Sequence, residues 1–331
     1  LHLQRADGLD DILVGENGMR SSGSVPVTSA ASEERLGVVI VFLAAVCWSL
    51  GGMFARYIDA QDVWTVVFWR SVWAALFLAG FMIWRDGVRG TVQMFRAMGL
   101  AGIAVGACFA IASTAFVVAL SYTTVANVLL IQASAPLFAA MMAYVVLGER
   151  ITVPTLLAIA AVLAGMGIMV SDSLSRNVSV IGEGLALLIV LVFSCATVLT
   201  RRFSQVRMTP AMFLGSAMAG IFASTQAGSF AVSAQDMAFL FAFGAINLGL
   251  GMAFFAIGAR MVPAVYAALL STFEPLLGPF WVWLAHGEMP SGSAMAGGAI
   301  VMAALLVYIV VEFRRMSKPS RPGVAGISAP R

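Results

Sequence analysis

Charged residues are scarce in this sequence. Asp, Glu, Lys and Arg together make up 11% of the 331 residues, whereas 61% of the residues are hydrophobic. A soluble globular domain carries about 25% charged residues, and a water-soluble fold of this length could not cover its surface with so few. The composition therefore excludes a soluble protein and makes the lipid bilayer the expected surroundings.

Lysine, histidine and cysteine are also scarce, and each scarcity excludes a kind of site. The one lysine, Lys318, lies in the C-terminal tail, so the chain has no P-loop, which ends in Lys followed by Ser or Thr. The two histidines, His2 and His286, are too few for a histidine zinc site. The three cysteines lie far apart in apolar runs, as small buried hydrophobes do: Cys47, Cys108 and Cys195. We therefore expect no metal, no cofactor and no ATP hydrolysis by this chain.

Long apolar runs, by contrast, are abundant. Runs of about 18 or more residues with few charges indicate membrane-spanning helices, and the continuous rather than alternating hydrophobicity argues against membrane strands. We therefore predict an all-α membrane protein. Its ten transmembrane helices lie at about 36–57, 64–84, 97–120, 123–147, 152–171, 182–203, 209–230, 237–260, 263–286 and 292–313.

Polar segments flank the ten predicted spans. Residues 1–35 and 314–331 lack an apolar core, and we predict that both tails are disordered. The chain begins with Leu1, and Met19 is a candidate start of translation. No cleavable signal peptide is visible, so we expect the first span to direct insertion itself.

The sequence is built from two similar halves. Three residue types recur at one offset of 139 positions, without a gap: Pro136/Pro275, Gly148/Gly287 and Glu149/Glu288. A second set recurs at an offset of 145: Gly37/Gly182, Ser49/Ser194 and Arg56/Arg201. Such self-similarity indicates a duplicated unit, and we place the two repeats at 36–171 and 182–313. Because each repeat holds five spans, an odd number, the two should cross the membrane in opposite orientations.

The basic residues predict which ends face the cytoplasm. If both termini are cytoplasmic, sixteen Arg and Lys residues lie in cytoplasmic segments, and only Arg56 and Arg176 lie in outer loops. Positive residues concentrate in cytoplasmic loops, so we predict a multi-pass protein of the inner (plasma) membrane with both termini inside. This role explains the net charge of +3 without a nucleic-acid partner.

Two stretches carry a resemblance to a known family: ALSYTTVANVLLIQASAPLFAAMMAYVVLGERIT at 119–152 and VPAVYAALLSTFEPLLGPFWVWLAHGEMPS at 262–291. With WSLGGMFARY and FWRSVWAALF in the opening spans, the chain resembles the EamA family of the drug/metabolite transporter superfamily over residues 37–313. The resemblance implies ten helices in two inverted five-helix repeats, a central cavity, alternating access and a small metabolite as cargo, most often exported. His286 before Gly287-Glu288 and Met289-Pro290 after them depart from the usual pattern, so the halves need not contribute equally to binding.

Two ionisable residues lie clearly inside predicted spans, Arg70 and Glu274. A charge at mid-membrane costs at least about 2.5–3.5 kcal/mol and normally marks a functional site. Counting about 1.5 Å per residue from the span ends places the two residues within about 5 Å in depth. We expect them to share a central cavity and to pair when it is empty. A static ion pair and two unconnected structural residues remain alternatives, and Glu274 is also a candidate proton carrier.

Prolines and glycines mark the ends and bends of the duplicated run. Pro136 and Pro275 each free a backbone carbonyl in mid-span, so we expect a fixed bend or a hinge there. Gly148-Glu149 and Gly287-Glu288 should close helices, because glycine tolerates a left-handed terminus and the glutamate favours the next helix N-terminus. We interpret them as structural corners.

Polar and aromatic residues inside the spans complete the predicted cavity: Trp48, Ser49, Asn127, Gln132, Asn247, Tyr266 and Ser271. Hydrogen bonds between helices explain such buried amides as well as cargo contacts do. No span carries an interior Asp, and His286 lies at a span end, so an intramembrane enzyme is disfavoured. A structural or receptor-like membrane protein without cargo and a channel remain alternatives. The cargo's identity and the oligomeric state are not encoded in any motif we recognise.

Overall fold

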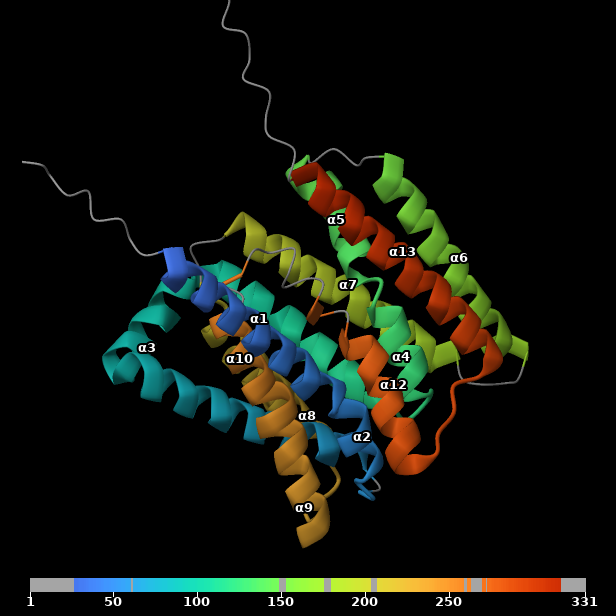
Figure 1. The fold of residues 1–331 in the computed structure, drawn as a ribbon. Helices are drawn as coiled ribbons and strands as arrows, with labels where there is room; N and C mark the ends of the chain where they lie inside the picture. Colours follow the sequence, from blue (N-terminus) through green and yellow to red (C-terminus); the bar gives the residue numbers. More distant parts are fainter. Residues whose placement is uncertain are drawn as a thin grey trace, which may run out of the picture.

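A computed structural model describes residues 27–60, 62–148, 153–175, 180–203, 207–258, 261–262, 270–271 and 273–316. The regular structure within these ranges is entirely helical, with no strand. The helices are α1 (Val27–Ser49), α2 (Gly51–Arg56), α3 (Val63–Ala119), α4 (Val125–Gln132), α5 (Ala135–Leu147), α6 (Val153–Ser175), α7 (Val180–Arg202), α8 (Met208–Gln226), α9 (Ala234–Phe241), the π-helix η1 (Ala242–Leu250), α10 (Gly251–Gly258), α12 (Phe273–His286) and α13 (Gly292–Met316) (Figure 1).

The helices have the dimensions of membrane spans. Six helical stretches are long and apolar enough to cross a bilayer: Arg35–Arg56, Val63–Ala119, Val125–Val146, Val180–Thr200, Ala234–Gly258 and Gly292–Val311. Their outward faces carry exposed apolar side chains such as Leu76, Leu100 and Ile221, as expected where lipid replaces water. The predicted all-helical class is therefore confirmed for the described residues, with six stretches that could span a membrane, and the count of ten spans stays a prediction.

The predicted tails are shorter than expected at the ends that the structure describes. Helix α1 begins at Val27, so residues 27–35 are helical, and α13 continues through Met316. Residues 27–35 and 314–316 therefore belong to helices, and the disorder of the tails stays a prediction. The remainder of both tails, 1–26 and 317–331, lies outside the described ranges.

Helix α3 covers two predicted spans together with the segment between them. Most of residues 85–96, which we expected to be a loop, are helical, but the helix is kinked at Gly87 (φ 67°) and at Gly99 (φ 54°), which leave the helical conformation. Both glycines adopt positive φ, which side chains with a Cβ rarely do. The chain therefore reverses direction through a helical corner with a glycine at each end, and the two arms of α3 are visible in Figure 1.

Three other predicted spans are interrupted within their length. The first breaks at Leu50, between α1 and α2, and the fourth breaks at Ala133-Ser134, just before Pro136 in the first turn of α5. The eighth changes from α9 to the π-helix η1 and then to α10. Interrupted helices free backbone groups that must find partners inside the protein, because lipid offers none.

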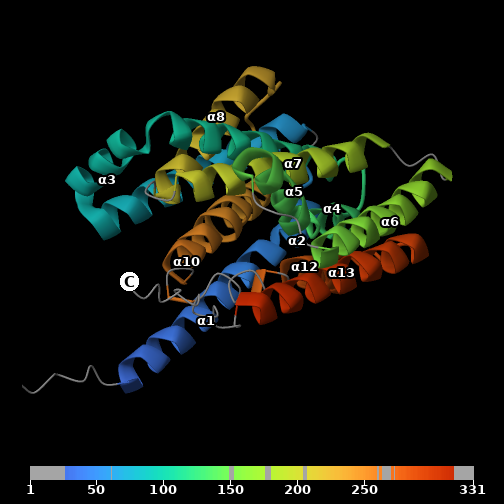
Figure 2. The same ribbon diagram turned by 90° about the horizontal axis from the view of Figure 1, so that it is seen from above.

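Contacts between the two halves come in matched pairs. Helix α1 packs against α10 and α12, and its repeat equivalent α7 packs against α3 and α5. Helices α6 and α13, which are equivalents of each other, lie side by side in both views (Figures 1 and 2), and α4 packs against α12. When each span is replaced by its equivalent in the other half, one observed contact therefore becomes another. This is what a two-fold relation between the halves requires.

The largest buried apolar cluster holds the same halves together. It joins residues of α3, α4, α5, α6, α7, α12 and α13, including Leu129, Leu137, Val190, Val282 and Leu305. The two halves therefore share one core at this interface, because the cluster contains residues of both.

Close packing of α6 on α13 generates the first prediction. A Cβ added at Gly165 would lie 2.7 Å from the carbonyl oxygen of Gly297, whereas one added at Gly167, in the same helix, would meet nothing within 4 Å. We expect Gly165→Ala to lower the free energy of unfolding by about 1–3 kcal/mol, because the backbone of α13 must move. Gly167→Ala is the control, and thermal melting in detergent is the measurement. Equal melting temperatures for the two variants would contradict this packing.

Candidate functional site

The break in the first span is bridged by a side chain from the other half. Asn247, in η1, donates from Nδ2 to the carbonyl oxygens of Cys47 and Trp48, both at 2.8 Å. These carbonyls lie in the last turn of α1, where helical acceptors lose their partners. Asn247 is buried. Its amide therefore does what water would do in a soluble protein, and it ties the break to the π-helix.

Side chains beside this break connect it to a third helix. Ser49 is fully buried, and its Oγ donates to the Val46 carbonyl at 2.7 Å and accepts from Trp281 Nε1 of α12 at 3.0 Å. Trp48 packs on Phe255 of α10, with ring centroids 5.3 Å apart, and its buried Nε1 has no partner among the described residues. The structure thus brings together three of the predicted residues, Trp48, Ser49 and Asn247.

Arg70, in α3, lies beside two aromatic rings. Its Nη1 donates to Ser113 Oγ at 2.6 Å and to the Ser113 carbonyl at 3.4 Å. Its Cζ lies 4.3 Å from the ring centroid of Phe243 and 5.8 Å from that of Phe116. Only 5% of the residue is exposed, and Nε has no partner among the described residues. Aromatic faces stabilise a cation, but they leave its positive charge without a counter-ion.

The expected ion pair between Arg70 and Glu274 is not formed. The structure describes both residues, and the ion pairs it contains among described residues are Arg56–Glu288 and Arg207–Asp86. Glu274 lies in the first turn of α12, where the neighbouring Phe273 packs edge-to-face on Phe42 of α1. Arg70 instead contacts η1 through Phe243. The depth calculation was too coarse, because helix breaks and lateral packing, not depth alone, decide which side chains meet.

A second buried polar group, missed by the sequence analysis, surrounds Asn127. Asn127 Nδ2 donates to Thr123 Oγ1 at 3.2 Å and to Glu183 Oε1 of α7 at 3.5 Å. Glu183 is only 3% exposed. It was overlooked because it stands one residue inside the predicted start of the sixth span. Asn127 therefore makes a contact between helices, and the buried Nε2 of Gln132 has no partner among the described residues.

The helix-end motif of the second half carries an ion pair. Gly287 adopts φ 66° after α12, and Gly148 adopts φ 69° after α5. Glu288 accepts from Arg56 Nε at 2.9 Å and from Arg56 Nη2 at 3.3 Å. The sequence pointed to both residues, through two different repeat offsets, but gave no reason to join them.

The remaining predicted residues are only partly placed. Tyr266 and Glu149 lie outside the described residues, as does most of the segment before α12. Ser271 is half-buried just before α12, and Pro275 is buried in the first turn of that helix. Whether Pro136 and Pro275 act as hinges stays a prediction.

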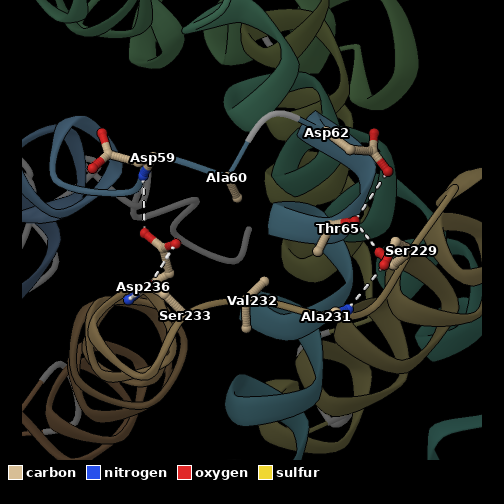
Figure 3. A pocket seen from close by; sticks show the side chains of 9 residues that line it. All are labelled: Asp59, Ala60, Asp62, Thr65, Ser229, Ala231, Val232, Ser233 and Asp236. Atoms are coloured by element: carbon tan, nitrogen blue, oxygen red, sulfur yellow. Dashed lines mark hydrogen bonds between the residues drawn. The ribbon is translucent and has the colours of Figure 1, made fainter.

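A cavity of about 380 Å³ opens between two loop segments, and none of the predicted site residues lines it (Figure 3). It is lined by Asp59, Ala60, Asp62, Thr65, Ser229, Ala231, Val232, Ser233 and Asp236. Asp236 Oδ1 accepts from the Asp59 amide at 2.9 Å, and Oδ2 accepts from Ser233 at 2.9 Å. The carboxylates thus hold the loop before α3 to the loop before α9.

Asp62 illustrates this loop-holding role. Partial burial raises the pKa of its carboxyl, but hydrogen bonds from the amides of Trp64 and Gly228 and from the Thr65 hydroxyl outweigh that effect. The pKa therefore lies below its ordinary value of 3.8. Asp62 stays ionised at neutral pH and caps α3. Among the described residues, no group of three His, Cys, Asp or Glu side chains could hold a metal ion.

Comparison with known protein families matches the chain to one of them. The EamA-like transporter family matches the chain twice, over residues 35–171 and 180–310. A solved structure, titled only as a crystal structure of a protein, superposes with a TM-score of 0.61 at 19% identity. The match covers 86% of this chain and 99% of the other, and it shows a shared fold. No curated protein matches the chain.

The bridge made by Asn247 generates the second prediction. Asn247→Asp replaces the donor with a third acceptor facing the Cys47 and Trp48 carbonyls. We expect the free energy of unfolding to fall by about 1–3 kcal/mol, because buried acceptors lose their partner. Thermal melting of the purified protein measures the change, with Gln226→Glu as an exposed amide-to-acid control. A melting temperature equal to that of the control would show that Asn247 does not stabilise the break.

Proposed function

Because the chain belongs to the EamA-like transporter family, we propose that it is a secondary transporter that exports a small polar or amphipathic metabolite, such as an amino acid, by alternating access. The membrane is the inner (plasma) membrane, and both termini are cytoplasmic. The distribution of Arg and Lys supports this orientation.

One observation supports the mechanism above the others: the two halves meet where helices are broken. The break of α1 at Leu50 is held by Asn247 from the π-helix of the other half. Discontinuous helices near the midplane form the binding sites of many secondary transporters, and π-helical segments often occur at functional sites. Matched contacts between the halves supply two surfaces that can rock against each other about such a site.

Arg70 supports a cargo that carries an anionic group. Its guanidinium is buried, its hydrogen-bond partner is the neutral Ser113, and no described carboxylate pairs with it. A buried cation without a counter-ion is costly, so a carboxylate arriving with the cargo would find a favourable partner there. Trp48 Nε1 and Gln132 Nε2 are further donors with unused capacity, which again suits an acceptor-bearing solute.

Two other functions remain open. A structural or receptor-like protein without cargo would need no matched pair of halves, and a channel would need a path open to both faces at once. Flux of labelled solute into vesicles that contain the purified protein separates the three. A transporter saturates with solute concentration, a channel does not, and a protein without cargo gives no flux.

The role of Arg70 generates the third prediction. A thermal-shift screen of amino acids and related metabolites identifies the cargo, because a ligand that binds only the folded protein raises its melting temperature. We expect Arg70→Gln to weaken binding of that cargo about 10- to 100-fold, the loss that follows from removing a charge-assisted hydrogen bond. Arg207→Gln, which removes an exposed ion pair with Asp86, is the control. Unchanged affinity in a folded Arg70→Gln variant would exclude Arg70 from the site.

Glu274 generates the fourth prediction, which concerns coupling. Glu274 has no hydrogen bond or ion pair among the described residues, and we propose that it carries the coupled proton. In vesicles, a pH gradient should then drive accumulation of the cargo, and Glu274→Gln should abolish that accumulation while downhill exchange continues. Accumulation that is indifferent to the pH gradient in the unmodified protein would rule out proton coupling.

A further inference from the structure

Arg56, at the end of α2, forms hydrogen bonds in two directions. Toward the second half of the chain, its Nε and Nη2 bind both carboxylate oxygens of Glu288, at 2.9 and 3.3 Å. Toward its own half, Nη1 donates to the Leu120 carbonyl at 3.2 Å and Nη2 donates to the Thr123 carbonyl at 3.3 Å. Those carbonyls lie just after α3 and before α4, where helical acceptors lack partners. Arg56 thus joins the first, third and fourth spans to the corner that follows α12.

The bonds of Arg56 are arranged so that the guanidinium can release Glu288 and keep the rest. Without Glu288, Arg56 still has the Leu120 and Thr123 carbonyls of its own half. The side chains are partly exposed, 31% for Arg56 and 24% for Glu288. When the pair opens, water can therefore hydrogen-bond to each charged group in place of its partner. An ion pair of this exposure is weak compared with a buried one. It is therefore suited to break and form in every cycle.

Contacts along α2 carry this junction to the break in the first span. Helix α2 is six residues long and lies against α12. Just before α2, Ser49 of α1 accepts from Trp281 of α12; just after α2, Tyr57 packs on His286, with ring centroids 4.3 Å apart. Arg56 and Glu288 close this row of contacts. If the Arg56–Glu288 ion pair broke, α2 could move relative to α1 about Leu50, where Asn247 holds the broken helix.

We propose that Arg56 and Glu288 form a latch between the two halves, and that this latch keeps the site at Trp48, Ser49 and Asn247 closed toward the face that carries the loops 58–60 and 227–233. The inference rests on the proposed transport function. The latch acts through α2 on the break beside Asn247, so Arg56 and Glu288 are positioning residues and need not touch the cargo. Because Glu149 lies outside the described residues, the latch is assigned to this face alone.

Accessibility of a reporter cysteine tests the latch without requiring a known cargo. Val67 is buried in the apolar cluster of Leu240 and Phe243, beneath the loops of this face. The reporter Val67→Cys is placed in full-length protein whose three native cysteines are changed to alanine. A membrane-impermeant maleimide is added to vesicles on the face that carries the loops 58–60 and 227–233. The rate at which the maleimide reacts with the reporter cysteine is measured.

Three variants of the reporter protein are compared with the unmodified latch: Arg56→Gln, Glu288→Gln and the control Arg207→Gln. We expect each neutral latch variant to be labelled about two- to fivefold faster, as suits the loss of a partly exposed ion pair. Arg207→Gln breaks an ion pair of similar length elsewhere, 2.8 Å against 2.9 Å, and should label slowly.

One result would overturn the latch: neutral variants, Glu288→Gln above all, that label at the unmodified rate. Elution profiles and melting temperatures establish that each variant is folded. If Arg56→Gln fails to fold, Glu288→Gln decides, since it preserves the bonds from Arg56 to Leu120 and Thr123. Flux measured in the same vesicles separates a failed latch in a working transporter from the absence of transport.

Discussion

The constraint on which this structure depends is that lipid cannot satisfy a backbone hydrogen bond. Most of the chain meets it by being helical, with many apolar side chains on the outward faces. Where a helix is interrupted, the protein must supply the missing partner itself. The Asn247 amide does so for Cys47 and Trp48, and the Arg56 guanidinium does so for Leu120 and Thr123. In both places, the side chain that supplies the missing partner also connects one helix to another.

The same junctions link the two halves, which is why they bear on function. Asn247 of the second half holds a break in the first, and Glu288 of the second half holds the helix end only six residues further on. Close packing of α6 on α13 and of α4 on α12, with a shared core, adds to the interface. A membrane protein whose halves interlock through weak polar junctions can exchange one set of contacts for another while its helices stay intact.

Composition and repetition predicted the class of fold, because hydropathy and helical periodicity are local properties. They also predicted that Trp48, Ser49 and Asn247 carry special roles, since amides and hydroxyls in apolar runs need partners. They could not predict the partners. Arg70 meets Ser113 and Phe243 instead of Glu274, and Glu183 lies buried beside Asn127, because tertiary packing decides which faces meet. The helical corner between Gly87 and Gly99 was also missed, since charged residues there resembled a loop.

The central claim is that the two halves rock against each other about the broken helices. Distances between spin labels measured by pulsed electron resonance test it most directly, at two pairs of exposed positions: Tyr122 with Met289 at one end of the bundle, and Leu100 with Phe203 at the other. On addition of saturating cargo in vesicles, one distance should lengthen while the other shortens. Two distances that stay fixed, or that change in the same sense, would contradict alternating access by these halves.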